Sequence, residues 1–242
     1  TGFLGALLAG FVGGYAVNFL KKVFAGLPAS LDGIKPILLY PFFGILIMGL
    51  ISLFIIAPPV SAINTWMIET LGGMDPSARV LMGLIVGGMM AVDMGGPINK
   101  AAYVTGTGLL ASGEYHVMAA VMAGGMVPPL AIALATTLFK NRFTESQRKA
   151  GITNYVMGLS FITEGAIPFA ASDPVRVIPS MVVGSALAGA LTMFFDCTLR
   201  APHGGIFVVP TIGNPLMYLV SILIGAIVGA IILSLLKKPI QE

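Results

Sequence analysis

The sequence predicts an all-α membrane protein, a multi-span helical bundle with two re-entrant hairpins. Of the 242 residues, 57% are hydrophobic and only 10% are charged, and the mean hydropathy is +0.96. A soluble domain of this length does not build a normal surface from so little charge. Several apolar runs reach the ~20 residues that a helix needs to cross a bilayer. The 31 glycines and 16 prolines favour closely packed and locally broken membrane helices.

The remaining composition excludes several other classes of protein. The net charge of +3 gives no nucleic-acid signal, because Lys and Arg lie at the ends of apolar runs rather than in a stripe. One cysteine and two histidines are too few for a disulfide, a metal cluster or a nucleophile–base pair. We therefore expect no metal and no cofactor. The chain opens with Thr1 inside an apolar run, without an initiator Met, so we expect it to be part of a longer protein.

The N-terminal third predicts two crossings and a linker. Gly2–Leu20 is long enough to span and is rich in glycine. Ile37–Ala57 is the second crossing, which we expect to stop at Pro58-Pro59. Val60–Leu71 has apolar residues at helical spacing around Trp66 and predicts an interfacial linker helix, with a packed loop helix as the alternative.

The middle of the chain alternates spans with broken segments. Ser77–Met94 predicts the third crossing. Gly95–Gly113 is too polar and glycine-rich for a smooth span and predicts an unwound or half-helical crossing. His116–Phe139 predicts the fourth crossing, interrupted at Pro128-Pro129, and Lys140–Lys149 is a hydrophilic loop.

The stretch Phe161–Asp173 is the candidate site on which the function depends. It places Glu164 in an otherwise apolar run and interrupts the backbone with Gly165 and Pro168. A carboxylate and a broken helix are both costly at membrane depth, and they are tolerated mainly where they line a buried cavity or a water-filled path. We therefore expect Ile152–Ser172 to form a re-entrant hairpin that carries a substrate site, with an apolar cytoplasmic loop as the alternative.

The C-terminal part predicts two further spans around a second broken segment. Val175–Leu199 is expected to cross, with Asp173 as its N-cap and as an i,i+3 partner of Arg176. Arg200–Pro215 is the second broken segment, and Leu216–Leu236 is the last span.

The basic residues support this topology through the positive-inside rule. If Gly95–Gly113 crosses and Ile152–Ser172 enters and leaves from the inside, ten of the 13 basic residues are cytoplasmic: Lys21, Lys22, Lys35, Lys140, Arg142, Arg148, Lys149, Arg176, Lys237 and Lys238. Arg79, Lys100 and Arg200 are the exceptions. A full crossing at 161–173 would place the C-terminal lysines outside, so the charge count favours a hairpin.

Polar residues within the apolar sequence form three clusters, each beside a Gly or Pro break: Asp93, Asn99 and Lys100; Thr163 and Glu164; and Asp196, Arg200 and His203. A carboxylate with amides and free backbone groups suits a neutral polyhydroxyl ligand such as a sugar, whereas an anion site would contain more Arg or Lys. Two structural alternatives stay open. Asp93 can neutralise Lys100, and Asp196 can pair with Arg200 at i,i+4.

Three motifs resemble a known family. Phe161-Ile-Thr-Glu-Gly-Ala-Ile-Pro-Phe169, Asp93-Met-Gly-Gly-Pro-Ile-Asn-Lys-Ala-Ala102 and Arg200-Ala-Pro-His-Gly-Gly205 are similar to the membrane component, enzyme IIC, of the fructose-type bacterial phosphotransferase system. Ile-Thr-Glu resembles the Gly-Ile-Thr-Glu signature of the wider glucose superfamily, with Phe161 where the signature has Gly. The resemblance covers essentially the whole chain. It implies that the first transmembrane helices of the family, and any fused IIA or IIB domain, are missing here.

The resemblance also implies an elevator-type fold in a homodimeric, multi-pass permease of the bacterial inner membrane. Residues 1–74 would form the scaffold and dimerisation helices with the interfacial linker. Residues 75–242 would form the sugar-transport domain, with re-entrant hairpins near 152–172 and 200–215. The partners would be a hexose, membrane lipid and the IIB and IIA components, with no nucleic acid.

Site residues follow from the same resemblance. Glu164 would bind sugar hydroxyls and orient the one that accepts phosphate, which makes it the catalytic candidate. The substrate-binding candidates are Glu164, Thr163, Asp93, Gly95, Gly96, Pro97, Asn99, Lys100, His203 and Gly204. The phosphoryl donor would lie on IIB, so Cys197 is not the phosphocysteine.

Two other functions remain open on the residues alone. An ion-coupled secondary transporter for a small polar solute also uses broken helices, so the two interrupted segments fit it as well. An intramembrane enzyme or an assembly scaffold fits less well, because nucleophile–base and metal-ligand spacings are missing from the sequence.

Overall fold

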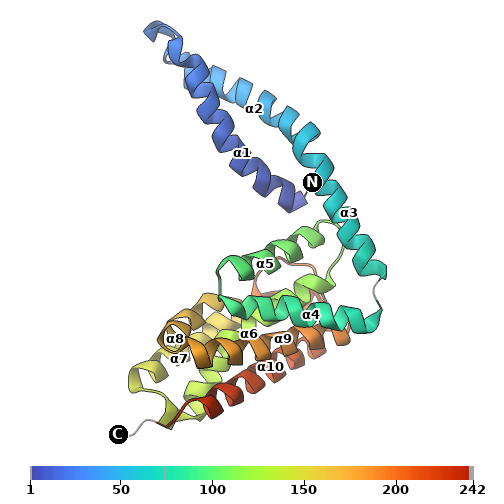
Figure 1. Cartoon of the computed structure of the whole chain (residues 1–242), viewed down its shortest axis with the longest axis vertical. Coiled ribbons are helices and arrows are strands. Elements are labelled where there is room, and N and C mark those ends of the chain that lie inside the picture. Colours follow the sequence, from blue (N-terminus) through green and yellow to red (C-terminus); the bar gives the residue numbers. More distant parts are fainter. Residues whose placement is uncertain (1, 74, 240–242) are drawn as a thin grey trace. The chain divides into compact units, whose positions relative to one another are not determined.

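The computed structural model describes residues 2–73 and 75–239 and divides into two compact units, residues 1–69 and 70–242 (Figure 1). Every element that begins in the smaller unit, among the described residues, is a helix or a helical turn. Its elements are α1 (Gly2–Val23), the 3-10 turns η1 (Phe24–Gly26) and η2 (Ala29–Leu31), the π-helical turn η3 (Lys35–Leu39), α2 (Tyr40–Ile51), the π-helical turn η4 (Ser52–Ile56) and α3 (Ala57–Gly73). α1 packs against α2.

The expected stop at Pro58-Pro59 is wrong. The helix passes from α2 through η4 into α3 without a break. A proline in a helix removes one backbone donor and crowds the carbonyl four residues earlier. The π-helical turn directly before the two prolines changes the spacing of these carbonyls, which lets the helix continue through both residues.

The larger unit holds the remaining described elements: α4 (Pro76–Val92), α5 (Pro97–Leu110), α6 (His116–Leu138), η5 (Lys140–Arg142), α7 (Glu145–Leu159), η6 (Thr163–Ala166), α8 (Ile167–Ser172), α9 (Pro174–Phe194), β1 (Thr198–Leu199), η7 (Gly205–Thr211), β2 (Ile212–Gly213) and α10 (Pro215–Leu236). Most predicted spans are therefore helices close to their expected bounds. α7 begins within the expected hydrophilic loop, because Thr144 and Gln147 form a capping box there.

Helix α6 is the centre of the larger unit. It is apolar on all sides, and α4, α7, α9 and α10 pack around it. A helix without a polar face is stable only when it is surrounded. Four helices in the described part of the chain are long and apolar enough to cross a membrane: Lys35–Ile63, His116–Leu138, Pro174–Phe194 and Pro215–Leu236.

Glycines bring α4 and α9 into close contact, as the composition predicted. A Cβ added at Gly87 would lie 2.5 Å from the carbonyl oxygen of Ser185, and one added at Gly189 would collide with the carbonyl oxygen of Gly83. Small residues at such contacts let helix backbones approach, which is the main source of packing energy between helices in lipid.

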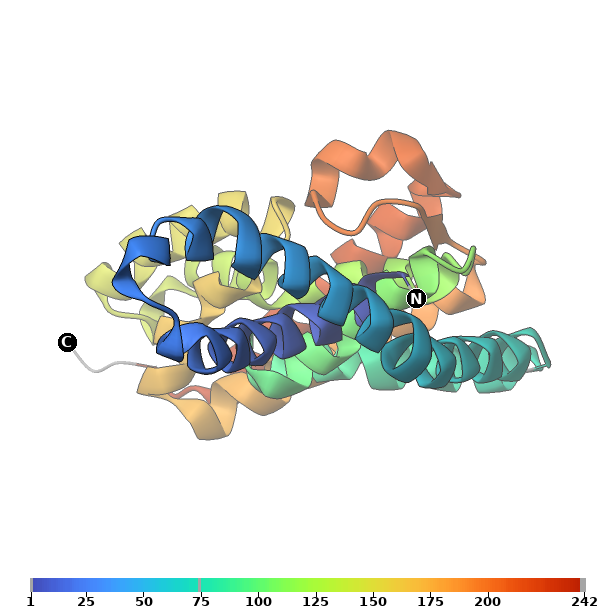
Figure 2. The ribbon, with the colours of Figure 1, turned by 90° about the horizontal axis from the view of Figure 1, so that it is seen from above.

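The segment 200–211 leaves the helical layer and returns to it (Figure 2). The short strands β1 and β2 pair antiparallel, with Thr198 opposite Gly213 and Leu199 opposite Ile212. This pairing fixes the two ends of the segment side by side, so its middle forms a closed loop that carries His203.

Replacing Gly189 by Ala is expected to destabilise the protein by about 1–3 kcal/mol, because the added methyl group overpacks a backbone contact. Gly49→Ala is the matched control, since no atom lies within 4 Å of a Cβ added at Gly49 in α2. Thermal unfolding in detergent measures both. Equal melting temperatures for the two variants would contradict the close α4–α9 contact.

Candidate functional site

The turn between α7 and α8, residues 160–166, is the tip of the expected hairpin and is attached to α6 at a proline. Pro128 and Pro129 lie inside α6, and the predicted interruption there is wrong, since the helix is continuous. Pro129 has no N–H, so the carbonyl of Gly125, four residues earlier, lacks its helical donor. The Thr163 hydroxyl donates a 2.8 Å hydrogen bond to this carbonyl, and both groups are buried. The tip thus satisfies an acceptor that the sequence of α6 leaves open.

Phe161 turns the chain from α7 into the tip. It has a φ of +62°, a left-handed conformation that glycine adopts easily and a phenylalanine rarely does. The signature that this motif resembles has glycine at this position, the residue that adopts this conformation most easily. The Phe161 ring is buried and lies where a side chain on Gly125 would be. Burial of the aromatic ring offsets the backbone strain.

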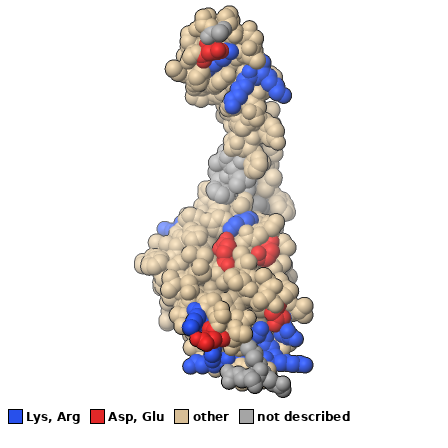
Figure 3. Space-filling view, turned by 90° about the vertical axis from the view of Figure 1, so that its left-hand side faces the viewer, with Lys and Arg blue, Asp and Glu red and all other residues tan. Residues whose placement is uncertain are grey.

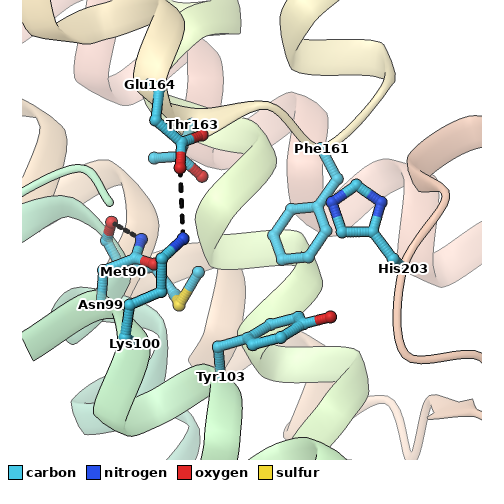
Figure 4. A pocket seen from close by; sticks show the side chains of 8 residues that line it. All are labelled: Met90, Asn99, Lys100, Tyr103, Phe161, Thr163, Glu164 and His203. Carbon is cyan, nitrogen blue, oxygen red and sulfur yellow. Dashed lines mark hydrogen bonds and ion pairs between the residues drawn. The ribbon is translucent and has the colours of Figure 1, made fainter. Parts of the chain in front are cut away.

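Beside the tip lies a pocket of about 210 Å³ (Figure 4). Its walls come from α4, α5, the α7–η6 turn, η6 and the loop before η7, and the lining residues are Met90, Asn99, Lys100, Tyr103, Phe161, Thr163, Glu164 and His203. Glu164 and Lys100 form a direct ion pair on one side of the pocket, with 3.2 Å between Oε1 and Nζ. Their side chains are 47% and 56% exposed, so the ion pair lies at the open side of the pocket.

Three rings form another part of the wall. The centroids of Phe161 and His203 are 4.9 Å apart, and Tyr103 lies 6.2 Å from Phe161 and 6.4 Å from His203. Figure 4 shows the rings grouped on one side of the pocket, opposite the Glu164–Lys100 pair. The pocket therefore has a charged, hydrogen-bonding side and an aromatic side.

Asp93 builds the pocket without lining it. Its carboxylate accepts hydrogen bonds from the backbone N–H groups of Ile98 (2.7 Å) and Asn99 (2.9 Å) at the start of α5. A carboxylate at a helix N-terminus satisfies free donors and favours the helix dipole. The alternative that Asp93 neutralises Lys100 is wrong, because Lys100 pairs with Glu164. Asn99 is buried, and its side-chain amide donates to the carbonyl of Met90.

Glycines let the turns approach the pocket. Gly95 has a φ of +123°, and a Cβ there would lie 2.8 Å from Glu164 Oε1. Gly204 has a φ of +127° directly after His203. Of the predicted site residues, the pocket brings together Thr163, Glu164, Asn99, Lys100 and His203, while Asp93, Gly95, Gly96, Pro97 and Gly204 shape the turns around them.

Met90, Tyr103 and Phe161 line the pocket but were not among the predicted site residues. Tyr103 lies three residues after Lys100 on α5, so a helical-face argument would have found it. Phe161 opens the motif itself. Met90 has no comparable signal, because a methionine in an apolar span is most often a packing residue.

The third predicted cluster separates. Asp196 does not pair with Arg200 as the spacing allowed. It lies 3.0 Å from His116 Nε2, while Glu114 lies 2.6 Å from His116 Nδ1. The hydrogen bond with His116 lowers the pKa of Glu114. Arg200 lies over the Tyr115 ring. The contacts of Asp196 and Arg200 therefore join the α5–α6 turn to the end of α9.

The chain has helices that are long and apolar enough to cross a membrane, and a polar pocket where other helices are interrupted. This combination is typical of a membrane transport protein. Residues 1–184 match the protein family described as "Phosphotransferase system, EIIC". The whole chain is 58% identical to the PTS system fructose-specific EIIABC component of Bacillus subtilis, of which it covers 38%, and 56% identical to the fructose permease IIC component of Bacillus amyloliquefaciens, of which it covers 79%. The chain therefore belongs to the EIIC family of the phosphotransferase system.

The similarity extends to an archaeal protein. The chain is 43% identical over 238 residues to the PTS system fructose-specific EIIC component of Haloferax volcanii, covering 63% of that protein. No solved structure has significant similarity to the chain.

Replacing Thr163 by Val is expected to lower stability by about 1–3 kcal/mol, because the Gly125 carbonyl loses its donor in a buried site. Thr163→Ser keeps the hydroxyl and is expected to retain most of the stability. Thermal unfolding of the two variants in one detergent is the measurement. A Val variant as stable as the Ser variant would show that the hydrogen bond does not hold the tip.

Proposed function

We propose that this chain is the sugar-translocating component of a fructose phosphotransferase system, which binds a hexose and carries it across the bacterial inner membrane for phosphorylation by a IIB partner. The observation that carries the proposal is the Glu164–Lys100 ion pair on one side of a pocket of about 210 Å³ whose other side is aromatic. Pockets for drug-sized ligands measure about 300–1,000 Å³, so this one suits a smaller solute such as a monosaccharide. The fructose-specific names of the relatives support the choice of sugar.

The chemistry of the pocket matches a neutral polyol. The Glu164 carboxylate accepts hydrogen bonds from hydroxyl groups, and the Lys100 ammonium donates them. The Tyr103, Phe161 and His203 rings offer an apolar face for the C–H side of a sugar ring. Because Glu164 and Lys100 neutralise each other, the pocket attracts no net charge. When a sugar enters, hydrogen bonds between its hydroxyls and these two side chains replace the contact between Glu164 and Lys100.

Glu164 is also the catalytic candidate. A sugar hydroxyl that attacks phosphorus must lose its proton as the new O–P bond forms and the bond to the donor breaks. A carboxylate that already accepts a hydrogen bond from that hydroxyl is placed to orient it and to take up its proton. His203, on the opposite wall, is a second acceptor. The phosphoryl group itself would come from IIB.

The names of two relatives support the partners. The Bacillus subtilis protein is an EIIABC component, and the Rhodobacter capsulatus protein, 55% identical over 217 residues, is an EIIB'BC component. We infer that this chain works with IIA and IIB components. Exposed apolar side chains of the smaller unit, such as Phe11, Tyr15 and Phe54, suit lipid or a second copy in a homodimer.

Two features support a mobile transport domain with re-entrant hairpins. Thr144 and Asp173 flank the segment that contains the first expected hairpin (152–172) and line one common pocket, whereas the tip lines another. The chain therefore enters and leaves this hairpin at the same end. All pocket residues belong to the unit 70–242, which fits a scaffold over residues 1–74 and an elevator-type domain over 75–242.

Replacing Glu164 by Gln is expected to weaken fructose binding at least about tenfold, because charge-assisted hydrogen bonds to hydroxyls become neutral ones. Glu145→Gln is the matched control, since Glu145 is an exposed carboxylate of the same unit that pairs with Lys149. Equilibrium binding of labelled fructose to the purified proteins measures both. Unchanged affinity in the Glu164 variant would refute its role.

Vesicles distinguish this function from ion-coupled transport. Vesicles that contain the protein are expected to accumulate fructose phosphate only when phosphorylated IIB is enclosed with it. Chromatography of the vesicle contents separates free sugar from sugar phosphate. Accumulation of unmodified fructose, driven by a sodium or proton gradient without IIB, would instead favour a secondary transporter.

A further inference from the structure

A second pocket, of about 290 Å³, lies at the base of the first hairpin. It joins the connection between α6 and α7, the start of α9 and the end of α10, and it is lined by Arg142, Thr144, Gln147, Asp173, Arg176, Lys237 and Lys238. Four side chains are cationic and one is a carboxylate. Figure 3 shows Lys and Arg gathered at this end of the larger unit.

The one carboxylate is already neutralised. Asp173 lies 3.1 Å from Arg176 and 3.3 Å from Lys237. Burial raises the pKa of Asp173, but the hydrogen bonds and charges of these two cations together lower it by more. The pKa of Asp173 therefore lies below its usual value. The side chain of Asp173, the expected N-cap, makes no capping hydrogen bond.

The other two cations keep their charge available. Arg142 donates a hydrogen bond to the backbone carbonyl of Lys237, which leaves further N–H groups of its guanidinium for a ligand. Lys238 is exposed. Among the described residues, neither side chain forms an ion pair with a carboxylate. The pocket therefore carries an excess of positive charge that an anion would balance.

The pocket lies where spanning helices end. α6 ends at Leu138, α9 begins at Pro174 and α10 ends at Leu236, and all three are long and apolar enough to cross a membrane. Apolar side chains next to the cations are strongly exposed, among them Leu138 at 67%, Val175 at 80% and Leu235 at 73%. Charged donors and exposed apolar groups thus occur together where three helices that are long enough to cross a membrane end.

We propose that this pocket binds the phosphate headgroup of an anionic phospholipid. A soluble anion would use the cations alone, whereas a lipid also uses the exposed apolar side chains beside them. The positive-inside rule places this basic end in the cytoplasmic leaflet, where basic pockets between transmembrane helices bind anionic headgroups. Arg142 and Arg176 supply the planar donors that suit phosphate oxygens.

Such a lipid would hold the base of the hairpin whose tip carries Glu164. The headgroup would join the start of α9, the end of α10 and the α6–α7 connection. The inference rests on the membrane embedding of the chain and not on the identity of the sugar.

The test compares lipids by their stabilisation of the detergent-solubilised full chain during thermal unfolding. Titrations use phosphatidylglycerol, phosphatidylcholine and inorganic phosphate. Of these three ligands, we expect only phosphatidylglycerol to stabilise the wild type at low concentration. The double variant Arg176→Gln/Lys238→Gln is expected to raise its apparent dissociation constant about 30-fold, and Lys238→Gln alone about fivefold. Lys238 has no described partner, so the single variant is informative even if the double variant folds poorly.

The control is Lys140→Gln/Lys149→Gln, which removes two charges from the same end of the unit but outside the pocket. Unchanged lipid affinity in this control supports the site. An equal loss in the control, or equal stabilisation by phosphatidylcholine, would overturn it as unspecific attraction. Stabilisation by inorganic phosphate as strong as by lipid would overturn the lipid assignment. Fructose binding, measured in parallel, reports on the sugar site separately.

Discussion

The hydrogen bond from Thr163 to the carbonyl of Gly125 is the constraint on which the proposed sugar pocket depends. The proline at 129 creates a buried acceptor without a helical donor, and a buried carbonyl left unpaired costs about 1–3 kcal/mol. The hairpin tip removes this cost by donating a hydroxyl. Gly125 also has to lack a side chain, because the Phe161 ring and Thr163 occupy that space. One proline and one glycine in α6, together with a threonine 38 residues after that glycine, therefore fix the position of Glu164.

The charge of Glu164 is balanced locally and not by burial. The sequence predicted an acid at membrane depth, and an unpaired carboxylate there would be costly. In the structure, Lys100 provides the opposite charge at 3.2 Å, and both groups reach the open side of the pocket. The pair can therefore separate when hydroxyl groups arrive, because water and the ligand hydroxyls solvate the two charges once they are apart. A fully buried pair would resist such an exchange.

The sequence was most informative about the elements and least informative about their partners. Apolar runs predicted nearly every long helix, and Gly and Pro marked the turns around the pocket, because both signals are local. The prolines at 58–59 and 128–129 were read as breaks, yet a π-helical turn and a threonine 34 residues away compensate them. Helix spacing allowed Asp196 to pair with Arg200, and closeness in sequence left open that Asp93 neutralises Lys100. The actual partners, His116 and Glu164, lie on other elements and are set by tertiary packing.

The two ends of the hairpin limit how a sugar can move. The tip is bound to α6, and the base is tied to α9 and α10 through Asp173, Arg176 and Lys237. α6, α9 and α10 pack on one another through much of their length. A hairpin held at both ends on one packed core cannot swing open alone without breaking buried contacts. The other pocket residues lie on elements of the same unit. The proposed elevator movement, in which this unit moves as one body, would therefore keep the site intact.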